Sequence, residues 1–323
     1  MHVLFVERHG LEETEIPVDL DHRPADLIIL SFSDSDLSVF AAGWRRAKIL
    51  NGDKFPSIRL ANLASLKHPV SVDVYIEKTL RHAKGVLVRL IGGVPYWSYG
   101  LDKTREIAKK NNIALAVVSA DGRQDQQLDD ISNLPLSTLR QLQHHCEVGG
   151  EVGAHSALAQ LALAAGLYTG PVRGSKSIED LGAWTPEGGI FSSINMPKII
   201  EKPLILIIIY RSFIVAADLK PIAALFENLQ QKGFRVLSLF VRSLKAPDAA
   251  AWIENQIVSY SPAFIINATS FSGKGKDGTS PLDKANVPVF QIALSTSNRS
   301  AWLEANRGLS PADMAMHVVL PEV

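Results

Sequence analysis

Short, solidly apolar runs rich in Val, Ile and Leu recur along the chain and leave few folds open to it. The longest run is Leu204 to Tyr210, and Val86–Ile91 and Ile113–Val118 are similar. A run without polar alternation is typical of a strand that is covered on both faces, as in a parallel sheet. Stretches with helical spacing separate the runs, so the sequence predicts strands that alternate with helices and right-handed crossovers.

The predicted elements form two sets, and 323 residues are enough for two domains of ordinary size. The first set has strands at Val3–Val6, Leu27–Leu30, Ile58–Leu60, Val86–Ile91 and Ile113–Val118, and helices at Ser71–Ala83 and Asp102–Asn111. Two further helices follow, one with Leu139, Leu142 and Cys146 on a shared face and one over Ser156–Leu167. The second set has strands at Leu204–Ile209, Arg235–Val241, Phe264–Ile266, Val289–Leu294 and His317–Leu320, and helices around 222–229, 248–258, 301–306 and 311–316.

The fold class we predict is α/β, with two open doubly wound, mostly parallel-sheet domains joined by a helical and Gly/Pro-rich segment. The N-terminal α/β domain is expected over 1–148, the connector over 149–200 and the second α/β domain over 201–323. Gly122 to Asn133 is expected to be an exposed polar loop, and the Gly- and Pro-rich stretch Gly166–Met196 to hold little regular structure. The chain stops soon after an apolar run, so we expect the second domain to continue beyond it.

Charge and cysteine content exclude several classes of function. The chain has 33 Lys and Arg against 33 Asp and Glu, which offers no long-range field for nucleic acid or anionic lipid. Cys146 is the sole cysteine, so a disulfide framework and a Cys-rich metal site are excluded. No apolar run reaches the roughly 20 residues of a membrane span. A cytoplasmic protein is expected.

The segment at the end of the Val86–Ile91 strand is the first candidate site. In a parallel sheet it leaves the carboxyl end of a strand, where open α/β folds bind ligands. An arginine inside an apolar run needs a carboxylate partner or faces a ligand site. The aromatic side chains either close one end of the core or contact a ligand or partner. The candidate residues are Arg89, Gly92, Gly93, Tyr96, Trp97 and Tyr99.

Two places in the second half of the chain also have polar side chains directly after a predicted strand. Arg211 follows the strand Leu204–Ile209, and Asn267 follows Phe264–Ile266. Polar side chains after a strand can hold an anion or an amide, or can simply close a turn.

Other motifs carry no predicted function. Gly273–Gly278 satisfies the dinucleotide pattern G-x-G-x-x-G, but no phosphate-binding helix is expected after it, and Thr279 stands where a P-loop requires lysine. His144 and His145 are adjacent, and neighbouring residues of a helix point about 100° apart, so they cannot both bind one ion from a regular helix. Neither His68 nor His155 is assigned as a base or ligand, so we predict no metal site and name no catalytic base.

Several motifs together resemble the N-terminal portion of the cobaltochelatase large subunit, in the family of ATP-dependent cobalt and magnesium chelatases. They occur in the same order and cover most of the chain, at Ser57–Leu63, His68–Asp73, Arg89–Gly100, Tyr210–Ser212, Asn267–Thr269 and Gly308–Glu322. Members of this family are several times longer, so the resemblance implies that this chain is a part of such a subunit and is inactive alone.

The resemblance also implies an activity. It is the insertion of cobalt(II), as substrate, into the corrin precursor hydrogenobyrinic acid a,c-diamide in aerobic cobalamin biosynthesis. ATP-Mg would be used by partner subunits that include an AAA+ motor, while the large subunit holds the tetrapyrrole. Two alternatives stay open: a magnesium chelatase large subunit that acts on protoporphyrin, and a non-catalytic α/β interaction module that docks a partner through its aromatic loop.

Overall fold

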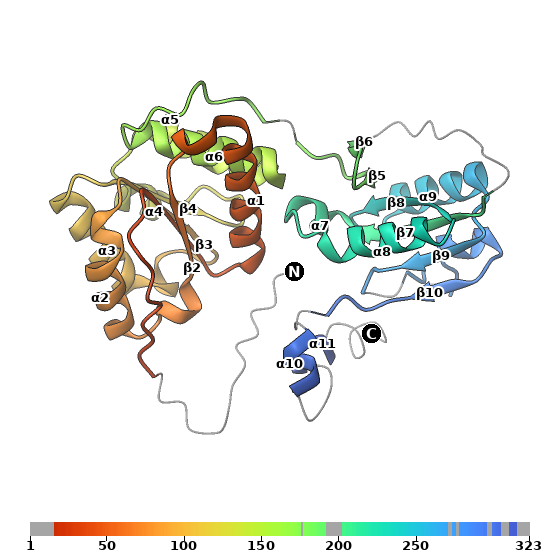
Figure 1. Cartoon of the computed structure of the whole chain (residues 1–323). Coiled ribbons are helices and arrows are strands. Elements are labelled where there is room, and N and C mark those ends of the chain that lie inside the picture. The colour runs from red at the N-terminus through yellow and green to blue at the C-terminus, as the bar shows by residue number, and fades with distance from the viewer. Residues whose placement is uncertain are drawn as a thin grey trace. The chain divides into compact units, whose positions relative to one another are not determined.

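The structure, a computed structural model, describes residues 16–175, 177–191, 202–270, 273–275, 278–295, 299–304 and 310–314. These residues divide into two compact units that part between Ile178 and Glu179, and Val215–Ala217 counts with the first unit. Each unit is built on a parallel-dominated sheet with helices on both faces, so the predicted fold class is confirmed (Figure 1). The predicted strands Val3–Val6 and His317–Leu320 lie outside the described residues.

The first unit holds a sheet of four parallel strands in the order β2-β1-β3-β4. Its strands are β1 (Leu27–Ser31), β2 (Ile58–Asn62), β3 (Gly85–Leu90) and β4 (Ala114–Ser119). Its α-helices are α1 (Asp34–Asn51), α2 (Pro69–Lys78), α3 (Ser98–Lys110), α4 (Gln126–Ile131), α5 (Leu136–Val148) and α6 (Gly150–Ala164). Short 3₁₀ turns are η1 (Gly52–Lys54), η2 (Leu63–Leu66), η3 (Leu80–His82) and η4 (Val94–Tyr96).

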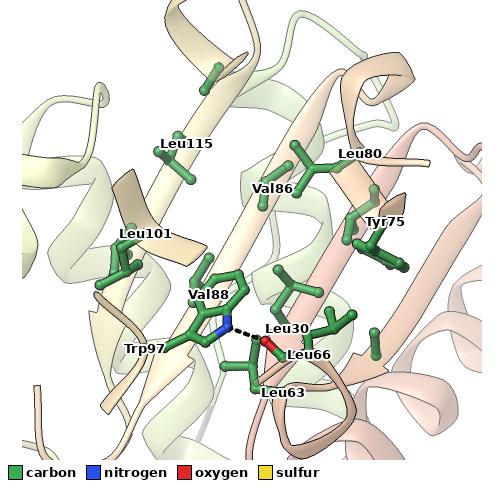
Figure 2. Close-up of a cluster of buried hydrophobic side chains, with 14 of the residues drawn as sticks. Leu30, Leu63, Leu66, Tyr75, Leu80, Val86, Val88, Trp97, Leu101 and Leu115 are labelled. Carbon is green, nitrogen blue, oxygen red and sulfur yellow. Dashed lines mark hydrogen bonds between the residues drawn. The ribbon is translucent and has the colours of Figure 1, made fainter. Parts of the chain in front are cut away.

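Alternating side chains of these strands feed two separate cores. In β1, Leu27 and Ile29 join a cluster with α1, α5 and α6, while Ile28 and Leu30 join a cluster with α2 and α3. Every residue of β1, β3 and β4 is buried, which is why the sequence shows unbroken apolar runs there. Figure 2 shows the second of these clusters.

The second unit holds a six-stranded sheet in the order β10-β9-β7-β8-β5-β6. Its strands are β5 (Leu181–Thr185), β6 (Gly189–Phe191), β7 (Leu204–Tyr210), β8 (Arg235–Val241), β9 (Phe264–Asn267) and β10 (Val289–Gln291). The helices are α7 (Arg211–Val215), most of which lies in this unit, α8 (Lys220–Gln231), α9 (Pro247–Tyr260), α10 (Arg299–Glu304), α11 (Pro311–Met314) and the 3₁₀ turn η5 (Pro281–Ala285). The face of the sheet that carries Leu206 packs against α9 and η5.

The two sheets share one topology. Read from β8, the second sheet runs β8-β7-β9-β10, which repeats the order β2-β1-β3-β4 of the first. In both, the second strand lies on one side of the first strand, and the third and fourth lie on the other. The second sheet is extended beyond β8 by β5 and β6, which pair antiparallel.

Parts of the chain that the sequence analysis leaves irregular are ordered. The expected polar loop contains α4, which begins at an Asp125 cap. The stretch 149–200, expected to be a helical and Gly/Pro-rich connector, holds α6 close to the helix predicted at Ser156–Leu167. α6 joins the core of the first unit, and β5 and β6 from the same stretch join the second sheet. β5 lies in the Gly- and Pro-rich stretch expected to hold little regular structure. Its one glycine, Gly182, is there for packing, because a Cβ at this position would lie 2.6 Å from the ring of Phe240. No helix among the described residues is long and apolar enough to cross a membrane.

Candidate functional site

The predicted site residues gather at equivalent places in the two sheets. The chain leaves β1 and β3 in opposite directions at their carboxyl ends, and likewise β7 and β9, which makes each a topological switch point. Arg89 of β3 pairs in register with Ser31, the last residue of β1. Asn267 of β9 pairs with Ile208 of β7, and Arg211 follows β7 directly. Open α/β folds bind ligands at such points, so these edges are the candidate sites.

At the first switch point, Arg89 is buried and paired. The residue is 5% exposed, and its guanidinium forms an ion pair with Asp36 in the first turn of α1. Ser31 Oγ donates to the same carboxylate at 2.8 Å. Burial opposes the charge, but Cys146, Asp36 and Glu147 outweigh it and raise the pKa of Arg89. The sequence left two possibilities for Arg89, a carboxylate partner or a ligand site. The structure shows the carboxylate partner, Asp36.

Two glycines carry the chain away from β3 in a conformation that other residues rarely adopt. Gly92 has a φ of 87° and Gly93 a φ of 78°. A Cβ at Gly92 would lie 2.2 Å from the ring of Tyr96, so the missing side chain also lets that ring lie against the backbone. Tyr96 is 58% exposed there.

The aromatic residues of this segment separate into one core residue and two surface residues. Trp97 is 6% exposed, belongs to the core cluster with α2 and α3, and donates its indole N–H to the Leu66 carbonyl at 2.8 Å (Figure 2). Tyr99 is 38% exposed, and its hydroxyl lies 2.9 and 3.0 Å from the carboxylate oxygens of Asp73. Trp97 therefore closes the core, and Tyr96 and Tyr99 lie at the surface.

Polar groups that were not predicted from the sequence line the rest of this edge. Asn62, the last residue of β2, donates to Asp34 at 2.7 Å, and Ser119, the last residue of β4, donates to Asp121. Hydrogen bonds from Arg123 and Ser119 hold the pKa of Asp121 below its usual value. The available signal was a polar residue at the ends of three strands, Ser31, Asn62 and Ser119, with a carboxylate shortly after Ser31 (Asp34 and Asp36) and after Ser119 (Asp121).

At the second switch point, Asn267 ties β9 to β10. The residue is 6% exposed, donates to Gln291 Oε1 at 2.8 Å, and accepts from the backbone and hydroxyl of Thr269 at 3.2 and 2.9 Å. Gln291 donates in turn to the Thr269 carbonyl at 2.7 Å. The network fixes the carboxyl ends of the two strands relative to each other.

Arginines cluster beside β7 and β8 at the same edge. Arg211 donates to the Glu179 carbonyl at 3.0 Å and lies 3.5 Å from Asp180. Arg242, which follows β8, pairs with Asp180 at 2.9 Å and with Asp248 at 2.8 Å. Two guanidinium groups thus share one carboxylate at an edge that is partly open to solvent.

Two of the histidines, His145 and His155, have partners within the first unit. His145 Nδ1 lies 2.8 Å from Ser175 Oγ, and His155 packs edge-on against Phe55 with ring centroids 5.6 Å apart. Within the described ranges, no group of three or more His, Cys, Asp or Glu side chains could hold a metal ion. Of the dinucleotide-like segment Gly273–Gly278, positions 276 and 277 lie outside the described residues.

Comparisons with known proteins add a family and a fold. The sequence model of the CobN/Magnesium Chelatase family matches residues 148–323, more than half of the chain. A Sinorhizobium protein named aerobic cobaltochelatase subunit CobN is 32% identical over 338 residues, and one of the same name from Pseudomonas aeruginosa is 30% identical over 339. Each match covers 100% of this chain and 26% of the relative, so the chain spans about a quarter of their length.

A solved structure is similar as well. It is described as the catalytic subunit of cobaltochelatase from Mycobacterium tuberculosis, with a TM-score of 0.67 and 21% identity. The likeness covers 92% of this chain and 23% of that one, and it supports the fold.

Proposed function

The chain belongs to the CobN/magnesium chelatase family, and from that premise we propose that it forms the N-terminal part of the large, tetrapyrrole-binding subunit of an ATP-dependent cobaltochelatase. The reaction is the insertion of Co(II) into hydrogenobyrinic acid a,c-diamide during aerobic cobalamin biosynthesis. AAA+ motor and associated subunits use ATP-Mg, and the complex works in the cytoplasm. This part alone has no chelatase activity.

We propose cobalt rather than magnesium as the inserted metal because of one observation. Both curated relatives are named aerobic cobaltochelatase subunits and match this chain over its whole length, at 32% and 30% identity. The family as a whole also includes magnesium chelatase, which makes insertion of magnesium into protoporphyrin the second candidate.

Metal insertion sets physical demands that this chain helps to meet. The ion must lose water, the ring nitrogens must lose protons, and the macrocycle must bend so that their lone pairs become accessible. A general base and oxygen or imidazole ligands meet the first two demands, and a rigid cavity meets the third. The described part of this chain supports the cavity: its strand ends are held by the Arg89–Asp36 pair and by the Asn267 network.

We infer that macrocycle or subunit contact falls to the exposed groups beside these held strand ends. Tyr96 and Tyr99 offer flat faces and hydroxyl tips, and the Gly92–Gly93 turn lets the backbone approach a ring closely. Arg211 offers a guanidinium for a ring carboxylate at the second switch point.

Reconstitution of the full-length subunit with its partner subunits tests the proposal. With ATP-Mg, we expect Co(II) to enter hydrogenobyrinic acid a,c-diamide and Mg(II) not to enter protoporphyrin, measured by the change in each absorption spectrum. Replacement of Tyr96 and Tyr99 by Ala should lower the rate, while Leu136→Ala, an exposed apolar residue of α5, should leave it unchanged. Magnesium insertion without cobalt insertion would establish the second candidate.

A further inference from the structure

One face of the second sheet is covered at one end and exposed at the other. A row of paired strand residues crosses this face from Trp184 of β5, past β8, through Ile207 and Ile266 to Phe290 of β10. At the first end, Phe226 of α8 packs edge-on against the Trp184 ring, with centroids 6.5 Å apart. At the other end, Phe290 is 54% exposed. The α8 side of the face is therefore covered, and its β10 end is open to solvent.

The open end carries a row of three aromatic rings. The Phe290 ring packs edge-on against Phe264 of β9, with centroids 5.5 Å apart, and Phe264 packs edge-on against Phe234 at 5.8 Å. Phe264 pairs in register with Ile205 of β7, so it lies on the same face as Phe290. Single exposed apolar residues are ordinary, whereas contiguous apolar groups at a surface mark an interaction site. This aromatic row is therefore a candidate docking surface.

The first unit shows what covers the equivalent face. There β3 and β4 take the places of β9 and β10, and α1 connects β1 to β2 as α7 and α8 connect β7 to β8. Leu87 and Ala116 pair on the α1 side of that sheet, and both are 0% exposed. The cluster that buries them contains Leu139 of α5 and Leu161 of α6. Helices that follow β4 in the chain thus complete the cover of the first sheet.

The helix that follows β10 is α10, and it carries exposed apolar side chains of its own. Trp302 is 47% exposed and Leu303 is 64% exposed. The link between Gln291 and Arg299 holds seven residues, 292–298, which can span up to roughly 23–25 Å. Neighbouring strands lie about 4.8 Å apart, so a link of this length lets α10 reach over β9 and β10. α10 and the aromatic row belong to the same unit and are complementary apolar surfaces.

We propose that α10 docks on the aromatic row, with Trp302 and Leu303 against Phe264 and Phe290, as α5 and α6 cover β3 and β4 in the first unit. The structure exposes both α10 residues, so the docked state is a second arrangement of the same chain. Docking covers β10, whose Gln291 belongs to the hydrogen-bond network at the second switch point. The helix thereby holds one side of that candidate site in place. The docking does not depend on the metal or the macrocycle.

Disulfide trapping in the 323-residue chain tests this. In a Cys146→Ala background, which removes the sole native thiol, Phe290→Cys is combined with Leu303→Cys. Oxidised glutathione is the oxidant, and intact mass after thiol labelling measures the closed fraction of monomer. The control pair is Val258→Cys with Leu303→Cys, because Val258 is 62% exposed on α9, which packs on the opposite face. We expect the first pair to close about tenfold faster or more, since docking raises the effective concentration of its two thiols.

A second measurement needs no cysteine. The ¹⁵N–¹H resonance of the Trp302 indole, identified by its loss in Trp302→Phe, should shift in Phe290→Ala. It should stay in place in Ile190→Ala, which changes a residue 47% exposed on β6, at the other end of the sheet. An unchanged Trp184 indole resonance reports that the second sheet is folded in each variant. Equal closure of the two cysteine pairs, or a Trp302 resonance that Phe290→Ala does not move, would overturn the proposal.

Discussion

At the scale of single residues, burial decides which predicted contacts can reach a ligand. The residues from Arg89 to Tyr99 are close in sequence, yet the fold buries Arg89 and Trp97 and exposes Tyr96. Trp97 follows a 3₁₀ turn that rotates its ring into the core formed by β3 and α3, where the Leu66 carbonyl receives its N–H. Sequence spacing cannot show such a division, because it depends on where the η2 carbonyl lies.

Replacing Trp97 by Ala should therefore lower the stability of the fold rather than remove a contact with a ligand. We expect a loss of about 3–5 kcal/mol in the free energy of unfolding, because a large buried side chain and its hydrogen bond are removed. Tyr96→Ala should change it by no more than about 0.5 kcal/mol, as is usual for exposed residues. Urea unfolding followed by circular dichroism measures both. Equal effects of the two changes would show that Trp97 is not a core residue.

Cys146 offers a second test at this scale, because it is the sole thiol. Cys146 is partly buried against the core of the first unit, and the loss of hydration raises the pKa of its thiol to about 11, against a weaker opposing effect of Arg89. Only the thiolate reacts with disulfide reagents, so at about pH 8 the folded protein should react about a hundredfold more slowly than free cysteine. The absorbance of released thionitrobenzoate follows the reaction, and full reactivity in urea is the control. A native rate close to that of free cysteine would contradict the burial.

At the scale of elements, the sequence predicts the buried strands well and the ends of helices poorly. The strand predicted at Arg235–Val241 matches β8, because every residue after Arg235 is buried, Ser238 included, and the others are apolar. The helix predicted at Ser71–Ala83 instead begins at Pro69, and His68 Nδ1 accepts the Val70 N–H at 3.1 Å. Ser71 Oγ accepts the N–H of Val18, a contact from distant sequence that local spacing cannot reveal.

The residues of the candidate site could likewise be predicted only in part from the sequence. Strand ends locate Arg89, Arg211 and Asn267 at switch points, because parallel strands bring their carboxyl ends to one edge. The partners Asp36 and Gln291 could not be assigned from the sequence, because each comes from another element whose position depends on the tertiary fold.

The free edge of β4 provides a prediction about an element. Asn133 accepts the Leu115 N–H at 2.7 Å and donates to the Ile113 carbonyl at 2.8 Å, so its side chain occupies the place of a neighbouring strand. Asn133→Ala should lower the free energy of unfolding by about 1–3 kcal/mol by leaving buried backbone groups unpaired. It should also increase self-association, because an open strand edge can pair with another chain.

Light scattering coupled to size exclusion, together with urea unfolding, measures both effects. Asn228→Ala is the matched control, since its side chain bonds only to the Ala224 carbonyl of its own exposed helix surface. If Asn133→Ala changes neither the free energy of unfolding nor the degree of self-association, then the Asn133 side chain does not protect the edge of β4.

At the scale of the whole molecule, two units with one topology carry different ionisable groups. The described histidines lie in the first unit, and the sequence has none from 179 to 316. Burial lowers the pKa of His22, His145 and His155 from the usual 6.5. Below about pH 6.5 the unfolded chain therefore binds more protons than the folded one, and the stability of the first unit falls as the pH falls.

Hydrogen exchange checks this difference between the units. From about pH 7.5 to about pH 5.5, protection factors should fall in peptides of the first unit and hold in those of the second, because all the described histidines, including the three with a lowered pKa, belong to the first unit. Each factor is taken relative to the unstructured rate at the same pH. An equal fall in both units, or a fall in the second alone, would contradict the assignment.

The central claim is that this chain is part of the subunit that holds a corrin ring while cobalt enters it. Disruption of its gene, followed by mass spectrometry of the pigments that accumulate in the cells, tests that claim most directly. We predict that metal-free hydrogenobyrinic acid a,c-diamide accumulates and that cobalamin falls, both restored by the intact gene. Unchanged cobalamin, or loss of magnesium protoporphyrin in its place, would contradict the claim.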